Sequence, residues 1–196
     1  MNRMKSAYEK AMERVEKMER PDENQRLEWK LLPEGRKLGA TFLKKQGAPF
    51  STIEVASTEH RPYLKKGMAE VLVSNIQLPK NEVAKDDLDH VVAGLERLMG
   101  SKSEAKELLK RVRYVSDQYW QHGIPQRKLA YAEIKLQMEQ QVAMAMSRQG
   151  GAASDVQINV ETMPEFQQEW LRIAGQIDQQ YEQHMEEFRT QVLELV

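Results

Sequence analysis

Residues 166–196, which read FQQEWLRIAGQIDQQYEQHMEEFRTQVLELV, determine the fold class that we expect for this chain. Apolar side chains recur in this stretch at intervals of three or four residues, which places them on one stripe of an α-helix. The stripe consists of Phe166, Trp170, Ile173, Ile177, Tyr181, Met185, Phe188, Val192 and Leu195. Its spacing is heptad-like with an interruption in the middle, which is typical of helices that pair along their length.

A helix from Met163 to the C-terminus would be roughly 50 Å long at about 1.5 Å per residue, so it must lie along another long helix. The apolar pattern predicts that second helix in residues 125–148, with a Gly-rich linker near residues 149–161. We therefore predict a long antiparallel helical hairpin in residues 124–196, with a coiled-coil-like C-terminal helix.

The helix in residues 125–148 covers only part of the longer C-terminal helix, so we expect a second copy of the chain to cover the rest. Buried aromatic and aliphatic side chains dominate such helical interfaces. The expected anchors of this homo-oligomer are Phe166, Trp170, Ile173, Ile177, Tyr181 and Phe188. The alternative is that the stripe packs back onto its own chain as ordinary core. The opposite face is expected to be solvated, and it carries Glu161, Glu165, Glu169, Asp178, Glu182, Glu186 and Glu187.

Residues 1–123 are predicted to form a separate head domain of short helices, which makes the whole protein all-α. The helical segments that we expect there are 4–19, 22–32, 37–45, 62–78, 86–99 and 101–123, with a short element at residues 51–56. Pro33 and Gly35 are expected to break the chain between the second and third of these segments. Ser101 and Thr162 each open a capping-box pattern, so we expect each to start a helix.

The composition excludes several kinds of chemistry. The chain has 196 residues and no cysteine, which rules out disulfides, thiolate zinc sites, iron–sulfur clusters and cysteine nucleophiles. Its 11 methionines indicate adaptable helical surfaces. The net charge is −1 overall, but residues 1–66 carry +5 and residues 151–196 carry −7, so the two ends could contact each other or bind different partners.

The sequence also bears on the location of the protein. It has no run of 18 apolar residues, so no membrane-spanning helix is predicted. A charged amphipathic segment follows the first residues instead of the apolar segment of a secretory signal. We therefore expect a cytoplasmic protein.

Residues 119–128, YWQHGIPQRK, combine two aromatic side chains, a histidine, a Gly-Ile-Pro break and a basic pair. The pattern is typical of a turn between two helices, with Gly123 in the left-handed conformation and Pro125 at the start of the next helix. The other interpretation is a helix-turn-helix reader of DNA, since residues 97–135 carry nine basic and four acidic residues. The basic side chains that could then contact nucleic acid or a ribosome are Arg111, Arg113, Arg127 and Lys128.

No motif in the sequence identifies an enzymatic reaction. Asp87 and His90 share one helical face, but a helical di-iron site needs two such pairs and two further carboxylates, so no metal site is predicted. The nucleophile elbow Gly-x-Ser-x-Gly and the Gly-rich phosphate loops are absent from the sequence. We therefore expect a protein that is not an enzyme and needs no cofactor.

The N-terminal segments Met4–Lys17 and Glu28–Leu38, which read MKSAYEKAMERVEK and EWKLLPEGRKL, resemble an N-terminal module of uncharacterised bacterial proteins. This resemblance covers about the first 45 residues and implies a bacterial protein of unknown role. Together with the helical pattern, it leads us to expect a non-enzymatic interaction or scaffold protein that self-associates through its C-terminal helix. The alternative is a nucleic-acid- or ribosome-associated factor that uses residues 97–135.

Overall fold

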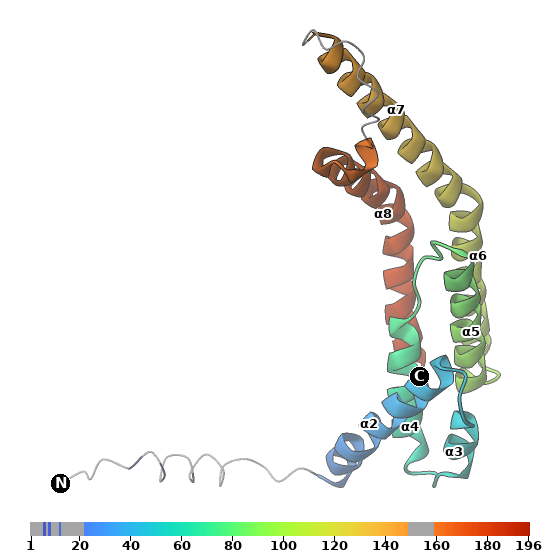
Figure 1. The fold of residues 1–196 in the computed structure, drawn as a ribbon. Coiled ribbons are helices and arrows are strands. Elements are labelled where there is room, and N and C mark those ends of the chain that lie inside the picture. The colour runs from blue at the N-terminus through green and yellow to red at the C-terminus, as the bar shows by residue number, and fades with distance from the viewer. Residues whose placement is uncertain (1–5, 7, 9–11, 13–21, 149–158) are drawn as a thin grey trace.

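The computed structural model describes residues 6, 8, 12, 22–148 and 159–196, and every regular element among them is helical (Figure 1). This confirms the all-α prediction. The elements are α2 (Glu23–Leu43), α3 (Pro49–Val55), α4 (Arg61–Ser74), α5 (Glu82–Met99), α6 (Ser103–Gln118), η1 (Tyr119–Gly123), α7 (Ile124–Arg148), η2 (Val160–Thr162) and α8 (Pro164–Leu195). Most of the helix predicted over residues 4–19 and most of the predicted linker lie outside the described residues. No helix within the described ranges is long and apolar enough to cross a membrane.

Helix α2 runs without interruption through Pro33, so the predicted break at Pro33 and Gly35 is wrong. Proline costs the helix one backbone hydrogen bond, and this loss is offset by the packing of α2 along α4. The start of α2 has strong local signals, because the Asp22 side chain accepts from the Gln25 backbone N–H at 2.7 Å. The Gln25 side chain in turn accepts from the Asp22 N–H at 3.2 Å.

Glycines set the close approach of α2 and α4. A Cβ atom on Gly35 would lie 2.4 Å from the Leu64 carbonyl oxygen, and one on Gly67 would lie 2.3 Å from the Leu32 carbonyl oxygen. Both contacts are with backbone atoms, which cannot move aside as the end of a side chain can. Gly35, read in the sequence as a helix breaker, therefore serves as a packing residue.

Helices α6 and α7 form one continuous rod, and the turn predicted at Gly123 is wrong (Figure 1). The π-helical segment η1 joins them, with the Ile124 N–H donating to the Tyr119 carbonyl five residues earlier. Gly123 does not have a positive φ. The wider turn accommodates Pro125, whose ring would press on a carbonyl in a regular α-helix. The chain therefore has no helix-turn-helix here, and the predicted domain boundary at residues 123 and 124 falls inside the rod.

Neither predicted capping box forms. The residues that flank α6 and α8 at their N-termini are Lys102 and Met163, and neither makes a side-chain capping hydrogen bond. The Thr162 hydroxyl instead donates to the Asn159 carbonyl at 2.8 Å, within the turn that precedes α8. Val160, near the end of the predicted linker, is buried and begins the short helix η2.

The rod of α6 and α7 packs against α8 in antiparallel order. Lys102 at one end of the rod donates to the Leu195 carbonyl at 2.6 Å, and Arg127 donates to the Ala174 carbonyl at 3.4 Å. Farther along the rod, the ring of Tyr131 lies edge-on to Phe166 near the start of α8, with 5.1 Å between ring centroids. The C-terminal half of α8 therefore lies beside the short helices, and its N-terminal half lies beside α7 (Figure 1).

The buried side chains form two clusters along this rod. The larger cluster joins the short helices to α6 and to Met185, Phe188 and Val192 of α8. The smaller cluster lies farther along the rod and contains Ile134, Val160 and Phe166, with Tyr131, Met138, Val142, Met163, Trp170 and Ile173 packed against it. The segment between the two clusters holds the polar side chains that are described next.

Candidate functional site

Asp178 lies between the two hydrophobic clusters and is the most buried carboxylate that the structure describes, with 7 % of its surface exposed. Its Oδ1 accepts from the Tyr119 hydroxyl at 2.8 Å, and its Oδ2 accepts from Arg127 Nη1 at 2.5 Å. Lys80 Nζ lies 3.3 Å from the same Oδ2. One carboxylate thus links the loop after α4, the π-helical segment, α7 and α8.

The π-helical segment makes this arrangement possible. Positions eight residues apart in an α-helix differ by about 80° around the axis, at about 100° per residue. The extra residue in the π turn lowers the difference between Tyr119 and Arg127 to about 20°, so both side chains face α8. Gly123 is required here, because a Cβ atom on it would lie 2.5 Å from the Tyr119 ring.

Burial raises the pKa of the Tyr119 hydroxyl, and the hydrogen bond to Asp178 raises it further. The hydroxyl therefore stays protonated at neutral pH and acts as a donor to the carboxylate. The Arg127 guanidinium, in addition to its ion pair, lies over the Trp170 ring at 5.1 Å from the ring centroid. A cation near a free helix N-terminus is disfavoured by the helix dipole. Arg127 does not incur this cost, because it lies within the continuous rod of α6 and α7.

A second polar group ties α7 to the segment before α8. The Glu161 carboxylate accepts from the Tyr131 hydroxyl at 2.8 Å and from Lys135 Nζ at 3.0 Å. The hydrogen bond from Lys135 is the main cause that lowers the pKa of Glu161, and the bond from Tyr131 lowers it further. Glu161 is therefore ionised at neutral pH and holds Tyr131 in a fixed orientation beside Trp170.

A cavity of about 240 Å³ opens beside the Asp178 ion pairs. Its lining consists of Lys80, Ile124, Arg127, Lys128, Tyr131 and Trp170. Lys128 is exposed and makes no ion pair with another described residue. The cavity therefore combines three cationic side chains with two aromatic ones.

The predicted interface residues lie mostly inside the chain. Phe166 and Phe188 are each 2 % exposed and belong to the two clusters, while Trp170, Ile173, Ile177 and Tyr181 are half-buried. The buried side of α8 also passes through Ala174 and Asp178, one residue after Ile173 and Ile177. Asp178 was assigned to the solvated face by its position beside the stripe, and that assignment is wrong.

The four predicted nucleic-acid residues do not share one surface role. Arg127 pairs with Asp178, and Arg113 donates to Glu96 at 2.6 Å. Arg111 is exposed and lies over the Phe188 ring at 5.2 Å from the centroid, while Lys128 lines the cavity. Only Arg111 and Lys128 of this set are therefore without a carboxylate partner among the described residues.

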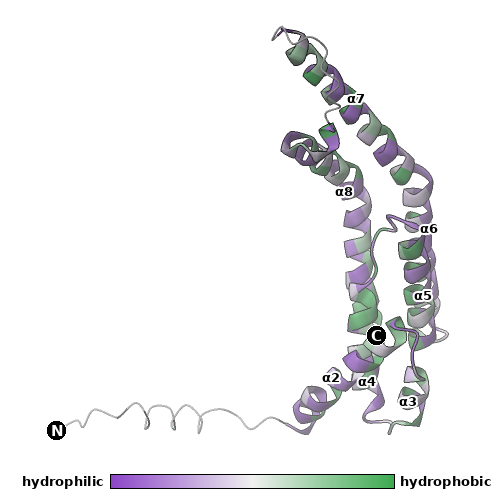
Figure 2. Ribbon diagram, in the orientation of Figure 1, coloured by the Kyte–Doolittle hydropathy of each residue, from purple (hydrophilic) through white to green (hydrophobic). Residues whose placement is uncertain are grey.

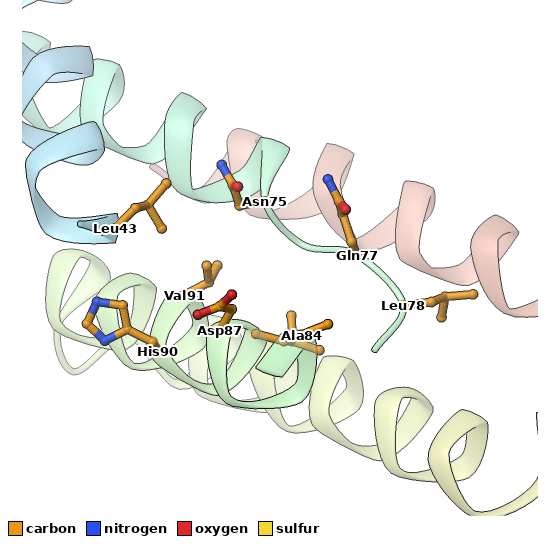
Figure 3. A pocket seen from close by; sticks show the side chains of 9 residues that line it. Leu43, Asn75, Gln77, Leu78, Ala84, Asp87, His90 and Val91 are labelled. Atoms are coloured by element: carbon orange, nitrogen blue, oxygen red, sulfur yellow. The ribbon is translucent and has the colours of Figure 1, made fainter. Parts of the chain in front are cut away.

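Asp87 and His90 line a different cavity of about 200 Å³ between α4 and α5 (Figure 3). The His90 ring stacks on Phe42 with 4.1 Å between centroids, and its Nε2 lies 3.0 Å from the Phe42 carbonyl oxygen. Figure 3 shows Asp87 directed into the gap, while His90 lies near Leu43. Within the described ranges, His, Asp and Glu side chains nowhere gather in a group of three that could hold a metal ion.

The fold and the polar group at its centre define an all-α protein in which two long antiparallel helices share one buried, multiply paired carboxylate. Residues 50–194 match a family described as a family of unknown function (DUF6657), and the chain belongs to this family. The match excludes the first 45 residues or so, on which the resemblance to bacterial proteins was based, and it includes the three residues Tyr119, Arg127 and Asp178. Neither a curated protein nor a solved structure matches the chain.

No direct signal in the sequence marks Lys80 and Asp178 as site residues. A usable signal is the interruption in the apolar stripe of α8. Helical spacing from Ala174 toward Met185 places a buried position at Asp178, which is polar. Asp178 and Lys80 are about a hundred residues apart in the chain, so no local pattern could have paired them.

Proposed function

We propose that this chain is a non-enzymatic helical interaction protein that self-associates through the outer face of α7. The observation that carries the proposal is the exposure of Leu129, Leu136 and Met144, whose surfaces are 62 %, 55 % and 61 % exposed. Leu129 and Leu136 are seven residues apart, which places them on one side of the helix. Exposed apolar side chains that share a helix face mark an interaction surface.

Helix α7 has apolar residues on its other side as well. Ile134, Met138 and Val142 pack in the smaller cluster against α8, away from the exposed side chains. Apolar residues recur along α7 up to its far end (Figure 2). A helix that is apolar on both sides is typical of one that is covered on both sides.

The occupant that we propose for the outer face is a second copy of the chain. A twofold interface brings identical surfaces together, so it disfavours a face that carries many charges of one sign. Residues 136–147 contain a single charged residue, Glu139, and three methionines that can adapt to a partner surface. The apolar stripe of α8, by contrast, is largely occupied within the chain, so self-association through α8 would require the rod to open.

Changing Leu136 and Met144 together to glutamate is expected to make the protein monomeric, because it places two carboxylates on each side of the twofold interface. The measurement is the molar mass by light scattering between about 1 and 100 µM, the range in which interfaces of modest size associate. A control is Val55→Glu, which changes an exposed valine on α3, outside the proposed interface. Circular dichroism should show the same helix content in all three proteins. A wild-type protein that stays monomeric throughout this range would contradict the proposal.

Nucleic-acid binding is the second candidate function. It is supported by Lys102, Lys106 and Lys110, which are exposed at four-residue intervals along α6. Such a stripe can follow the phosphates of a nucleic acid. Lys102 already donates to the C-terminal end of α8, whereas Lys110 makes only an exposed pair with Glu107 at 3.8 Å, so Lys106 and Lys110 are the better probes.

The test of this second candidate is binding to a labelled RNA or DNA duplex at several salt concentrations. If the candidate is right, affinity falls steeply with salt, and Lys106→Glu with Lys110→Glu lowers it by about tenfold or more. Arg127→Glu is unsuitable for this purpose, because it breaks the buried pair with Asp178. Absence of binding at about 50 mM salt, where phosphate contacts are strong, would rule the candidate out.

A further inference from the structure

The cavity beside Asp178 has an excess of positive charge. Three cationic side chains line it, and the carboxylate of Asp178 pairs with two of them, Arg127 and Lys80. None of the lining residues is acidic. Lys128, the third cation, has no carboxylate partner among the residues that the structure describes. The three cations and Asp178 together therefore carry a net charge of +2, which a bound anion would lower.

The other side of the cavity is apolar and rigid. Trp170 is held by Arg127 over its ring and by Tyr131, whose ring lies edge-on at 5.1 Å between centroids. Tyr131 is itself fixed by the hydrogen bond from its hydroxyl to Glu161. Ile124 completes this wall. Aromatic walls that are fixed in this way bind planar groups without losing side-chain freedom.

The volume of the cavity indicates the size of the group that it can hold. A buried apolar cavity of about 150 Å³ holds one benzene molecule. The cavity here, at about 240 Å³, therefore has room for a single ring and a short arm that ends in a charged group. Small-molecule sites commonly have this character, in which an apolar wall supplies affinity and a few polar groups fix the orientation.

We propose that this cavity binds a small organic anion with one aromatic ring, whose carboxylate or phosphate lies between Lys80 and Lys128 and whose ring lies against Trp170. The site is separate from the outer face of α7, and the proposal does not depend on self-association. Because the cavity is lined by the loop after α4, by α7 and by α8, the bound anion would join three segments of the chain.

Isothermal titration calorimetry of the full chain with phenylacetate, phenyl phosphate and the neutral phenylacetamide tests the proposal. We expect at least one of the two anions to bind with a Kd below about 1 mM and the amide to bind at least about tenfold more weakly. The preference between the two anions identifies the charged group that the site takes. Binding should weaken as salt is raised, since the cations are partly exposed.

Two variants assign the binding to this cavity. Lys128→Gln is expected to weaken binding of the preferred anion by about fivefold, which corresponds to the loss of roughly one partly exposed charge pair. Arg111→Gln, an exposed cation on α6 outside the lining, should leave the affinity unchanged. The doubly substituted Leu136→Glu, Met144→Glu protein should bind as the wild type does, which separates this proposal from self-association. Equal binding of the amide, no effect of Lys128→Gln, or no binding of any probe at about 5 mM, would each overturn the proposal.

Discussion

Asp178→Ala is expected to lower the free energy of unfolding by about 3 kcal/mol, because it leaves the Arg127 guanidinium partly buried without a counter-charge. The Tyr119 hydroxyl, which is fully buried, loses its acceptor at the same time. This loss of about 3 kcal/mol is at the lower end of the range for a broken buried ion pair. The reason is that the side chain of Arg127 keeps 18 % of its surface exposed. Urea unfolding followed by circular dichroism measures the change.

Two controls separate the buried pair from a general effect of removing charge. Glu169→Ala removes an exposed carboxylate from the same helix, where it pairs with Arg172, and should change stability by less than about 1 kcal/mol. The double variant Asp178→Leu, Arg127→Met replaces the ion pair by apolar side chains and should recover much of the loss. If Asp178→Ala and Glu169→Ala had equal effects, the central role of Asp178 would be contradicted.

Gly67→Ala is expected to destabilise the protein by about 2 to 3 kcal/mol, because the new methyl group would lie 2.3 Å from the Leu32 carbonyl oxygen. Backbone cannot move aside locally, so α2 and α4 would have to separate along their crossing. The same unfolding measurement detects the loss, and the m-value should stay unchanged if only stability is affected.

Gly175→Ala is the matched control for this substitution. Gly175 lies within α8, and a Cβ atom there would meet nothing within 4 Å. Alanine favours the helix over glycine by about 1 kcal/mol, so this variant should be as stable as the wild type or more stable. The two substitutions are chemically identical and differ only in their surroundings, so we expect changes in stability of opposite sign. Equal effects would show that the crossing of α2 and α4 does not depend on Gly67.

The elements that could be predicted were those whose cause is local periodicity. The stripe from Phe166 to Leu195 correctly indicated one long helix, and the all-α class followed from the same kind of pattern elsewhere. The buried side of that helix was harder to predict, because it moves by one residue to Ala174 and Asp178. An aspartate at a buried position looks like a surface residue until its partners on other helices are known.

The elements that were missed depend on contacts between distant segments. Gly-Ile-Pro at residues 123–125 has the composition of a turn, yet the rod continues because the Tyr119 ring lies against Gly123 and its hydroxyl reaches α8. Pro33 likewise resembles a helix stop, but α2 is held along α4 on both sides of it. In both cases tertiary packing outweighs a local preference of a few kcal/mol.

The single wide turn at Tyr119–Gly123 also sets the register of the 25 residues of α7. An ordinary α-helical turn there would move each later position along by one. Gln126 would then face Asp178 in place of Arg127, and Gln137 and Gln141 would face α8 in place of Met138 and Val142. A relative that is one residue shorter in this segment can therefore keep the same contacts with a regular α-helix, whereas a relative of equal length must retain the inserted residue as a π turn.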